Sequence, residues 1–257
     1  GGYIQRHIRE GESMSKHIVV GLTATLTLMF LMVFTAVPVL AFDARAGDTI
    51  TIASGEVVDD DLYMAANTIT IDGTINGDLW AAGNTIIVNG VVNGSIMVAA
   101  QTINISGDVD HAVRAVGQTI NINGNVTGDV MLGCSDVNIA GTAKIGGDIL
   151  FGAGIAGIGG LIEGDIKGYG GRVTIGNGVQ GNVDLKVDNL TILPTANIGG
   201  DLSYTSEEEA DIQSGAQIAG TTTHNLPPAP VKEEPAKAFP CFPSFFVELQ
   251  EIVNKVI

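Results

Sequence analysis

Hydrophobic side chains recur along residues 47–224 at intervals of 17 or 19 residues. The interval is clearest from a two-residue marker, most often Gly-Asp, that begins at residues 60, 77, 94, 111, 128, 147, 164, 181 and 200. An aliphatic residue stands two positions before and two positions after most markers. These columns supply the predicted core, which includes Ile75, Leu79, Val92, Ile96, Val126, Val130, Ile145, Ile149, Ile162 and Ile166. Self-similarity at a short fixed period is typical of a solenoid, in which each repeat stacks on the one before it.

Further along each repeat, pairs such as Ile69 and Ile71 or Ile103 and Ile105 alternate with polar residues. Alternation with a period of two predicts strands that bury one face. A column of glycines follows, where a tight corner is easiest without a Cβ. The pattern therefore predicts an all-β fold, a single-stranded parallel β-helix of triangular section. We expect strands of about four to six residues, about 17 residues per rung and about ten rungs over residues 47–224.

An uncharged apolar stretch at residues 18–40 precedes the repeats and follows Lys16 and His17. It is long enough to span a bilayer and also fits a signal peptide, so residues 1–46 are predicted to be an N-terminal extension with either a cleaved signal or a retained anchor. Positive charge precedes the stretch and little follows it. The positive-inside rule therefore places the β-helix outside the cytoplasm, membrane-associated at the cell surface or envelope.

A proline-rich segment, residues 225–243, follows the repeats and is predicted to be an extended linker. Residues 244–257 then space Phe246, Leu249, Val253 and Val256 as one face of a short amphipathic helix. Such a short helix is marginal alone. We expect it to need a membrane surface, a partner or further chain beyond Ile257.

The formal net charge of −16 arises within the repeats, because residues 47–224 hold 5 basic and 21 acidic side chains. This balance argues against nucleic acid as a partner, since a phosphate backbone needs a basic surface. A GxGxxG match at residues 152–157 lies inside a repeat, with no helix predicted to follow it, and no GxxxxGK[ST] is present. No nucleotide and no other cofactor is therefore expected.

Carboxylates form one column of the repeat, at Asp61, Asp78, Asp129, Asp148, Asp165 and Asp201. Carboxylates stacked one rung apart repel one another, which raises their pKa or recruits a divalent cation. Asp129, Asp148 and Asp165 are therefore the candidate metal ligands, and a carbohydrate-binding or polysaccharide-lyase-like β-helix is the alternative function. The other interpretation of the column is a solvated turn position.

Other polar residues in the repeats are assigned no chemistry. His111 is the one histidine within the regular rungs, and acyltransferases built on β-helices use a histidine, but no six-residue rhythm accompanies it here. Amide columns at Asn67, Asn84, Gln101 and Gln118, and at Asn104, Asn121 and Asn138, are expected to form hydrogen-bonded ladders. Cys134 and Cys241 are expected to be unpaired thiols. No catalytic residue is predicted.

The run Gly73-Thr-Ile75-Asn-Gly77-Asp-Leu79, with echoes at residues 124–130 and 161–166, resembles the bactofilins, the polymer-forming cytoskeletal family. The resemblance covers about residues 47–224. It implies a right-handed β-helix that assembles end to end into non-polar filaments without nucleotide and scaffolds membrane- or wall-associated proteins. The apolar stretch and the proline-rich linker depart from the usual family pattern, and they favour a membrane-anchored relative.

The sequence thus predicts a non-enzymatic structural protein, exported or membrane-anchored through residues 18–40. Its expected partners are further copies of itself, stacked end to end, or membrane and envelope proteins. Unpaired strand edges at the ends of a solenoid favour such stacking. Acidic runs at residues 59–61 and 207–209 are expected to oppose it as charged gatekeepers.

Overall fold

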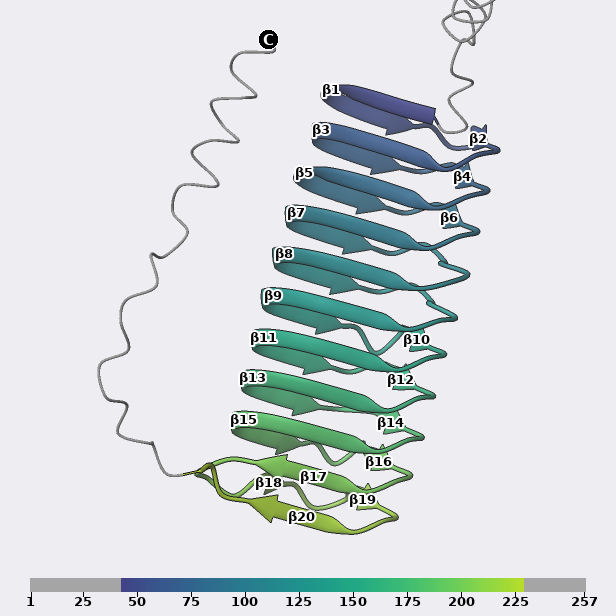
Figure 1. The fold of residues 1–257 in the computed structure, drawn as a ribbon. Coiled ribbons are helices and arrows are strands. Elements are labelled where there is room, and N and C mark those ends of the chain that lie inside the picture. The colour runs from purple at the N-terminus through teal and green to yellow at the C-terminus, as the bar shows by residue number, and fades with distance from the viewer. Residues whose placement is uncertain (1–42, 229–257) are drawn as a thin grey trace, which may run out of the picture.

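The structure, a computed structural model, describes residues 43–228, and within that range it contains strands and no helix. The strands pair in parallel and stack along one axis as a β-solenoid of eleven rungs (Figure 1). The predicted all-β parallel β-helix is confirmed. Its first rung begins at Asp43, ahead of the expected residue 47, because Asp43–Ala46 pair with Leu62–Ala65 of the next rung.

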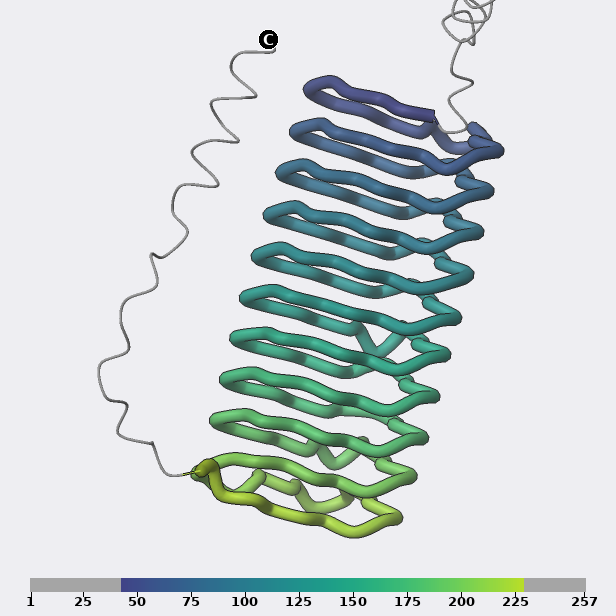
Figure 2. Tube along the Cα trace, viewed as in Figure 1, coloured from purple at the N-terminus to yellow at the C-terminus, as the bar shows by residue number. Residues whose placement is uncertain are grey.

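Most rungs begin with a strand of ten residues that supplies two faces of the solenoid. These strands are β1 (Asp43–Ile52), β3 (Leu62–Ile71), β5 (Leu79–Val88), β7 (Ile96–Ile105), β8 (Val113–Ile122), β9 (Val130–Ile139), β11 (Ile149–Ile158), β13 (Ile166–Ile175) and β15 (Val183–Ile192). Their paired register skips the sixth residue, which is Asn67 in β3 and Asn84 in β5. The chain reverses direction within each strand, giving a narrow edge to the flattened section (Figure 2).

These long strands differ from the expected strands of four to six residues. The strand pairing continues on both sides of the bend, so one strand covers what the sequence pattern divides into two. In β3 and β5 one exposed polar residue is enough to make the bend. Its side chain projects into solvent, while the aliphatic side chains on either side of the bend face inward.

The third face is short and closes each rung. It consists of β2 (Val57–Val58), β4 (Thr74–Ile75), β6 (Val91–Val92), β10 (Lys144–Ile145), β12 (Leu161–Ile162), β14 (Gly178–Val179), β16 (Asn197–Ile198) and β19 (Gln217–Ile218). Isolated bridges joining Val92, Val109, Val126 and Ile145 continue this face between β6 and β10. Two long faces and one short face therefore enclose the core.

Rungs of 19 residues differ from those of 17 at one corner only. In the longer rungs a turn lies between the second and third faces, with Glu56 N–H donating to Ala53 O at 2.9 Å, Ala143 N–H to Ala140 O at 2.9 Å and Ala196 N–H to Leu193 O at 3.0 Å. Because the two extra residues are confined to this turn, the inward columns stay aligned across the change in repeat length.

Aliphatic side chains fill the solenoid along its whole length. The ten core positions predicted from the sequence are each at most 1% exposed. Large and small side chains alternate between neighbouring rungs in places. The ring of Phe151, which is 2% exposed, fills the space in front of Gly168 one rung later. The core is therefore packed by complementary shapes, as protein interiors generally are.

The regular pattern ends in the last two rungs. Here the strands shorten to β17 (Leu202–Thr205), β18 (Asp211–Ile212) and β20 (Thr222–Asn225). Tyr204 stacks on His224 with ring centroids 4.6 Å apart, and the His224 ring lies 2.9 Å from Ser206 O. This end of the solenoid is consequently irregular, whereas β1 at the other end retains the full ten residues.

Candidate functional site

The acidic column lies at the corner that leads into each long strand, and it forms a hydrogen-bonded ladder. Each carboxylate Oδ1 accepts the backbone N–H of the residue at the same position one rung later. The donors and distances are Asp78 to Asp61 at 2.8 Å, Ser95 to Asp78 at 2.7 Å, Asp148 to Asp129 at 2.9 Å, Asp165 to Asp148 at 2.8 Å, Asn182 to Asp165 at 2.6 Å and Thr221 to Asp201 at 2.7 Å. These side chains therefore satisfy backbone donors that the corner leaves outside the strand pairing.

The glycine of each Gly-Asp pair makes room for this ladder. A Cβ on Gly147 would lie 2.3 Å from Asp129 Oδ1, and a Cβ on Gly164 would lie 2.3 Å from Asp148 Oδ1. Glycine and aspartate thus recur together because the glycine of one rung must accommodate the carboxylate of the rung before.

The candidate metal ligands Asp129, Asp148 and Asp165 occupy consecutive steps of the ladder. Within residues 43–228, no group of three or more His, Cys, Asp or Glu side chains is placed to hold a metal ion. Nor does any buried side-chain nitrogen or oxygen in that range lack a hydrogen bond. The structure gives the column a structural role as an acceptor of backbone N–H groups.

Replacing Asp148 by alanine is expected to lower the free energy of unfolding by about 1–2 kcal/mol, because the Asp165 N–H loses its acceptor. Asp148→Asn is expected to change it by less than about 0.5 kcal/mol, since the amide Oδ1 still accepts. The chain already uses this substitution, because Asn182 Oδ1 accepts the Asp201 N–H at 3.0 Å. Urea unfolding followed by circular dichroism measures both. An asparagine variant as unstable as the alanine variant would mean that the charge, not the acceptor, is required.

His111 lies exposed at the corner that carries the marker column. Its backbone oxygen accepts the Gly128 N–H at 3.1 Å. The two amide columns each contain a side-chain hydrogen bond, from Gln101 to Gln118 at 3.1 Å and from Asn121 to Asn104 at 2.8 Å.

Cys134 is a half-buried free thiol on β9. Burial, and secondarily the Asp136 carboxylate, raises the pKa of this thiol to about 11. The thiolate reacts with alkylating reagents and the thiol does not.

At pH 8, we therefore expect iodoacetamide to alkylate Cys134 about 100-fold more slowly in the folded protein than in urea. Mass spectrometry of a Cys241→Ser variant isolates this residue. Because the folded pKa lies above the unfolded one, its contribution to stability is present below about pH 9 and is lost as the pH rises towards about 11. Equal alkylation rates in both states would contradict the raised pKa.

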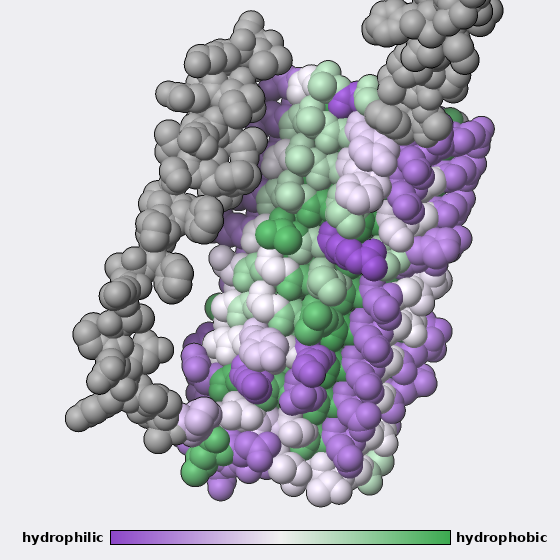
Figure 3. Space-filling view, viewed as in Figure 1, coloured by the Kyte–Doolittle hydropathy of each residue, from purple (hydrophilic) through white to green (hydrophobic). Residues whose placement is uncertain are grey.

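The outward side of the first half of the long strands, here called the first face, is apolar over much of its length. One outward column carries Ala44, Tyr63, Trp80, Met97, Arg114, Met131, Leu150, Lys167, Asp184 and Ser203. The second carries Ala46, Ala65, Ala82, Ala99, Val116, Gly133, Gly152, Tyr169, Lys186 and Thr205. Figure 3 shows the resulting band of hydrophobic surface along the front of the solenoid.

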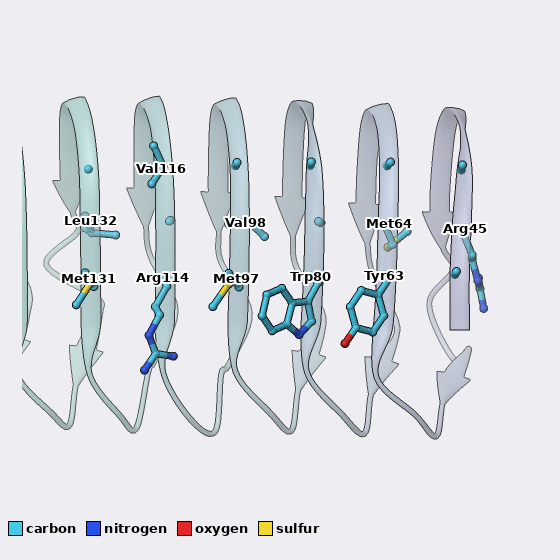
Figure 4. Close-up of a pocket in the computed structure, with 18 residues that line it drawn as sticks. Arg45, Tyr63, Met64, Trp80, Met97, Val98, Arg114, Val116, Met131 and Leu132 are labelled. Carbon is cyan, nitrogen blue, oxygen red and sulfur yellow. The ribbon is translucent and has the colours of Figure 1, made fainter. Parts of the chain in front are cut away.

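Long side chains project together from successive strands of this face. The rings of Tyr63 and Trp80 are nearly parallel, at 10°, with centroids 5.8 Å apart (Figure 4). Met97, Arg114 and Met131 continue the row on the same side of the sheet. A hollow of about 960 Å³ lies along this face, lined by the long side chains of the first column and by Ala46, Ala65, Ala82 and Ala99 of the second. Trp80 is 39% exposed and Val116 is 64% exposed, so apolar surface is presented to solvent here.

The inward columns, from which the fold is predicted, do not reveal this face. The signal was present one position further along each strand, where Tyr63, Trp80 and Met97 fall at the interval of 17 residues. Outward residues of the second half of the same strands are mainly polar, with Thr49, Thr68, Thr85, Thr102 and Thr119 in one column. The apolar character therefore belongs to one face and is not general.

No family model, no curated protein and no solved structure matches this chain. The apolar stretch predicted at residues 18–40, the linker and the amphipathic segment of residues 244–257 lie outside the described residues. Within residues 43–228, the structure contains no helix that could cross a membrane.

Proposed function

We propose that this chain is a non-enzymatic structural protein of the bactofilin type, exported and membrane-associated, whose β-helix associates end to end without nucleotide. The observation that carries the proposal is the open edge of β1. Of the described strands, β3 is the only one that pairs with β1, so within residues 43–228 no strand pairs along the other edge of this ten-residue strand. Unpaired edges of this length favour pairing with another chain.

One apolar side chain of the first rung supports association at this end. Ile50 packs against the core but is only half-buried, so it leaves apolar surface for a second copy to cover. Arg45 forms ion pairs with Asp43 at 2.8 Å and with Glu56 at 2.9 Å. Through these contacts Arg45 lowers the pKa of both carboxyl groups, and it balances part of the negative charge at the end. Asp59–Asp61, expected to oppose stacking, lie at the corner leading into β3 and not within β1.

The opposite end is less suited to pairing. Its last strand, β20, has four residues, and the exposed Glu207, Glu208 and Glu209 lie between β17 and β18. Short edges and exposed charge are devices that limit edge-to-edge association. We therefore assign association to the β1 end, which joins two copies through the same surface.

Negative-stain electron microscopy and sedimentation of the full chain in mild detergent test the proposal. We expect particles joined end to end, each about 50 Å long from eleven rungs spaced about 4.8 Å apart. Ile50→Lys should abolish the joined species, because it places a charge on the apolar end. Ile218→Lys is the matched control, since Ile218 is also a partly buried residue packed against the core, at the opposite end.

Circular dichroism establishes that both variants remain folded before their association is compared. A wild-type chain that stays monomeric at high protein concentration and high salt would overturn the proposal. Loss of association in the Ile218→Lys variant alone would move the contact to the other end. Because the stacked carboxylates already accept backbone N–H groups, the proposal does not extend to cation or polysaccharide chemistry.

A further inference from the structure

Charge is distributed very unevenly over the surface of the solenoid. Residues 43–228 contain 22 acidic and 6 basic side chains. The 20 outward positions of the two first-face columns, from Ala44 to Thr205, carry one acidic residue, Asp184, and three basic residues, Arg114, Lys167 and Lys186. The first face therefore has a formal charge of +2 on a domain of −16. It is the more basic of the two long faces, because the outward positions of the second half of the nine long strands carry one acidic residue, Asp136, and one basic residue, Arg172.

The side chains of this face are of the kind that enter the boundary between water and lipid. Trp and Tyr combine an apolar ring with a polar group, and the long stems of Arg and Lys lie along apolar surface while their charges reach outward. Here Tyr63, Trp80, Met97 and Met131 flank Arg114 in one straight column. The neighbouring column consists of short side chains, at Ala65, Ala82 and Ala99, so the long side chains project beyond it.

The polarity of the face changes along the solenoid axis. Arg114 is the only charged residue among the outward positions of the first seven rungs, from β1 to β11. The next three rungs carry Lys167, Asp184 and Lys186, with Lys167 3.9 Å from Asp184 and the Lys186 amine 5.5 Å from the centre of the Tyr169 ring. The apolar part thus begins at the end of the solenoid that the uncharged stretch of residues 18–40 precedes.

We propose that the first face rests on the surface of an anionic lipid bilayer, with the solenoid axis lying along the membrane. Tyr63, Trp80 and the methionines enter the interfacial region, and Arg114, Lys167 and Lys186 contact lipid phosphates. Anionic headgroups attract basic side chains near the surface. The acidic column lies at the corner beside this face, where its carboxylates accept backbone N–H groups of the following rungs. The inference rests on the membrane association in the proposed function and is independent of end-to-end association.

A second copy is a poorer occupant of this face. Two first faces brought together would place six basic side chains and two carboxylates in one interface, because each face carries Arg114, Lys167, Lys186 and Asp184. A phosphate-bearing surface matches the same three residues. The charge pattern therefore favours lipid over self-association through this face.

Trp80 makes the proposal directly measurable, because it is the only tryptophan in the chain. The full chain is reconstituted into vesicles of phosphatidylcholine and phosphatidylglycerol, with and without bromine atoms on the lipid chains. We expect the brominated lipid to quench Trp80 fluorescence by roughly half, because the indole lies at the interface. The unbrominated vesicles give the reference intensity for the same protein.

Two charge-reversal variants distinguish binding through the first face from an effect of the net charge of the protein. Arg114→Glu should reduce the quenching to about half its wild-type value, because it replaces the central cation of the face with an anion. Arg172→Glu makes the same change in net charge on the second half of β13, where Arg172 points outward from another face. It should leave the quenching unchanged.

Three results would overturn the proposal. Unquenched Trp80 in a chain that still floats with the vesicles would show that the solenoid stands away from the bilayer. Quenching that appears only after residues 229–257 are removed would show that this segment covers the face. Trp80 emission that depends on the protein-to-lipid ratio, without quenching, would indicate a second copy. End-to-end association, tested separately with Ile50→Lys, is unaffected by any of these results.

Discussion

Phe151→Ala is expected to lower the free energy of unfolding by about 3–5 kcal/mol, because it removes a buried ring and leaves a cavity in the middle of the solenoid. Phe151 is 2% exposed and belongs to β11, with Leu132 on one neighbouring rung and Gly168 on the other. Urea unfolding followed by circular dichroism measures the change. The preceding residue, Leu150, points outward and is 38% exposed, so Leu150→Ala is the matched control and should cost less than about 1 kcal/mol.

A second substitution tests whether Phe151 and Gly168 fit each other. A Cβ on Gly168 would lie 2.3 Å from the Phe151 ring, so Gly168→Ala alone should destabilise the protein by about 1–3 kcal/mol. In the Phe151→Ala background the ring is absent, and Gly168→Ala should be neutral or stabilising. The double-mutant cycle should therefore give a coupling energy above about 1 kcal/mol. Additive effects would mean that the ring and the glycine do not share one space.

The inward columns could be predicted from the sequence because each buried position recurs at the same place in every repeat. Ile75, Leu79 and Val92 are apolar for one reason, burial inside the stack, and period-two alternation separates them from outward neighbours. The bend within each long strand could not be predicted in this way. Residues such as Asn67 and Asn84 are as suitable for a corner between two strands as for a bend within one.

The acidic column shows where composition misleads. A row of carboxylates one rung apart has the composition of a cation site, and only the coordinates reveal that Asp129 and Asp148 each accept a backbone N–H of the following rung. The first face escaped prediction for the opposite reason. Its exposed Trp80 and Met97 recur with the same period as the core but at outward positions, where the alternation of each strand leads one to expect polar residues.

Gly107→Ala is expected to be as damaging as the loss of Phe151, at about 3 kcal/mol or more, because the new methyl group meets rigid backbone. Gly107 follows β7 at the corner between the second and third faces, where its N–H donates to Val88 O at 3.0 Å. A Cβ there would lie 1.7 Å from Gly90 O on the preceding rung. The glycine is required by the close stacking of successive corners, and the rungs would have to separate to admit a side chain.

Gly141 provides a control, because it occupies the same position of the repeat as Gly107 in a different rung. Gly141 lies in the turn of a 19-residue rung, and a Cβ there would have its nearest neighbour, Gly159 O, at an ordinary contact distance of 3.6 Å. Gly141→Ala should therefore be neutral or stabilise the protein by about 0.4–1 kcal/mol, because alanine restricts the unfolded chain. Thermal unfolding of both variants measures the difference. Equal destabilisation at the two positions would show that the glycines of this column serve backbone conformation rather than the stacking distance between rungs.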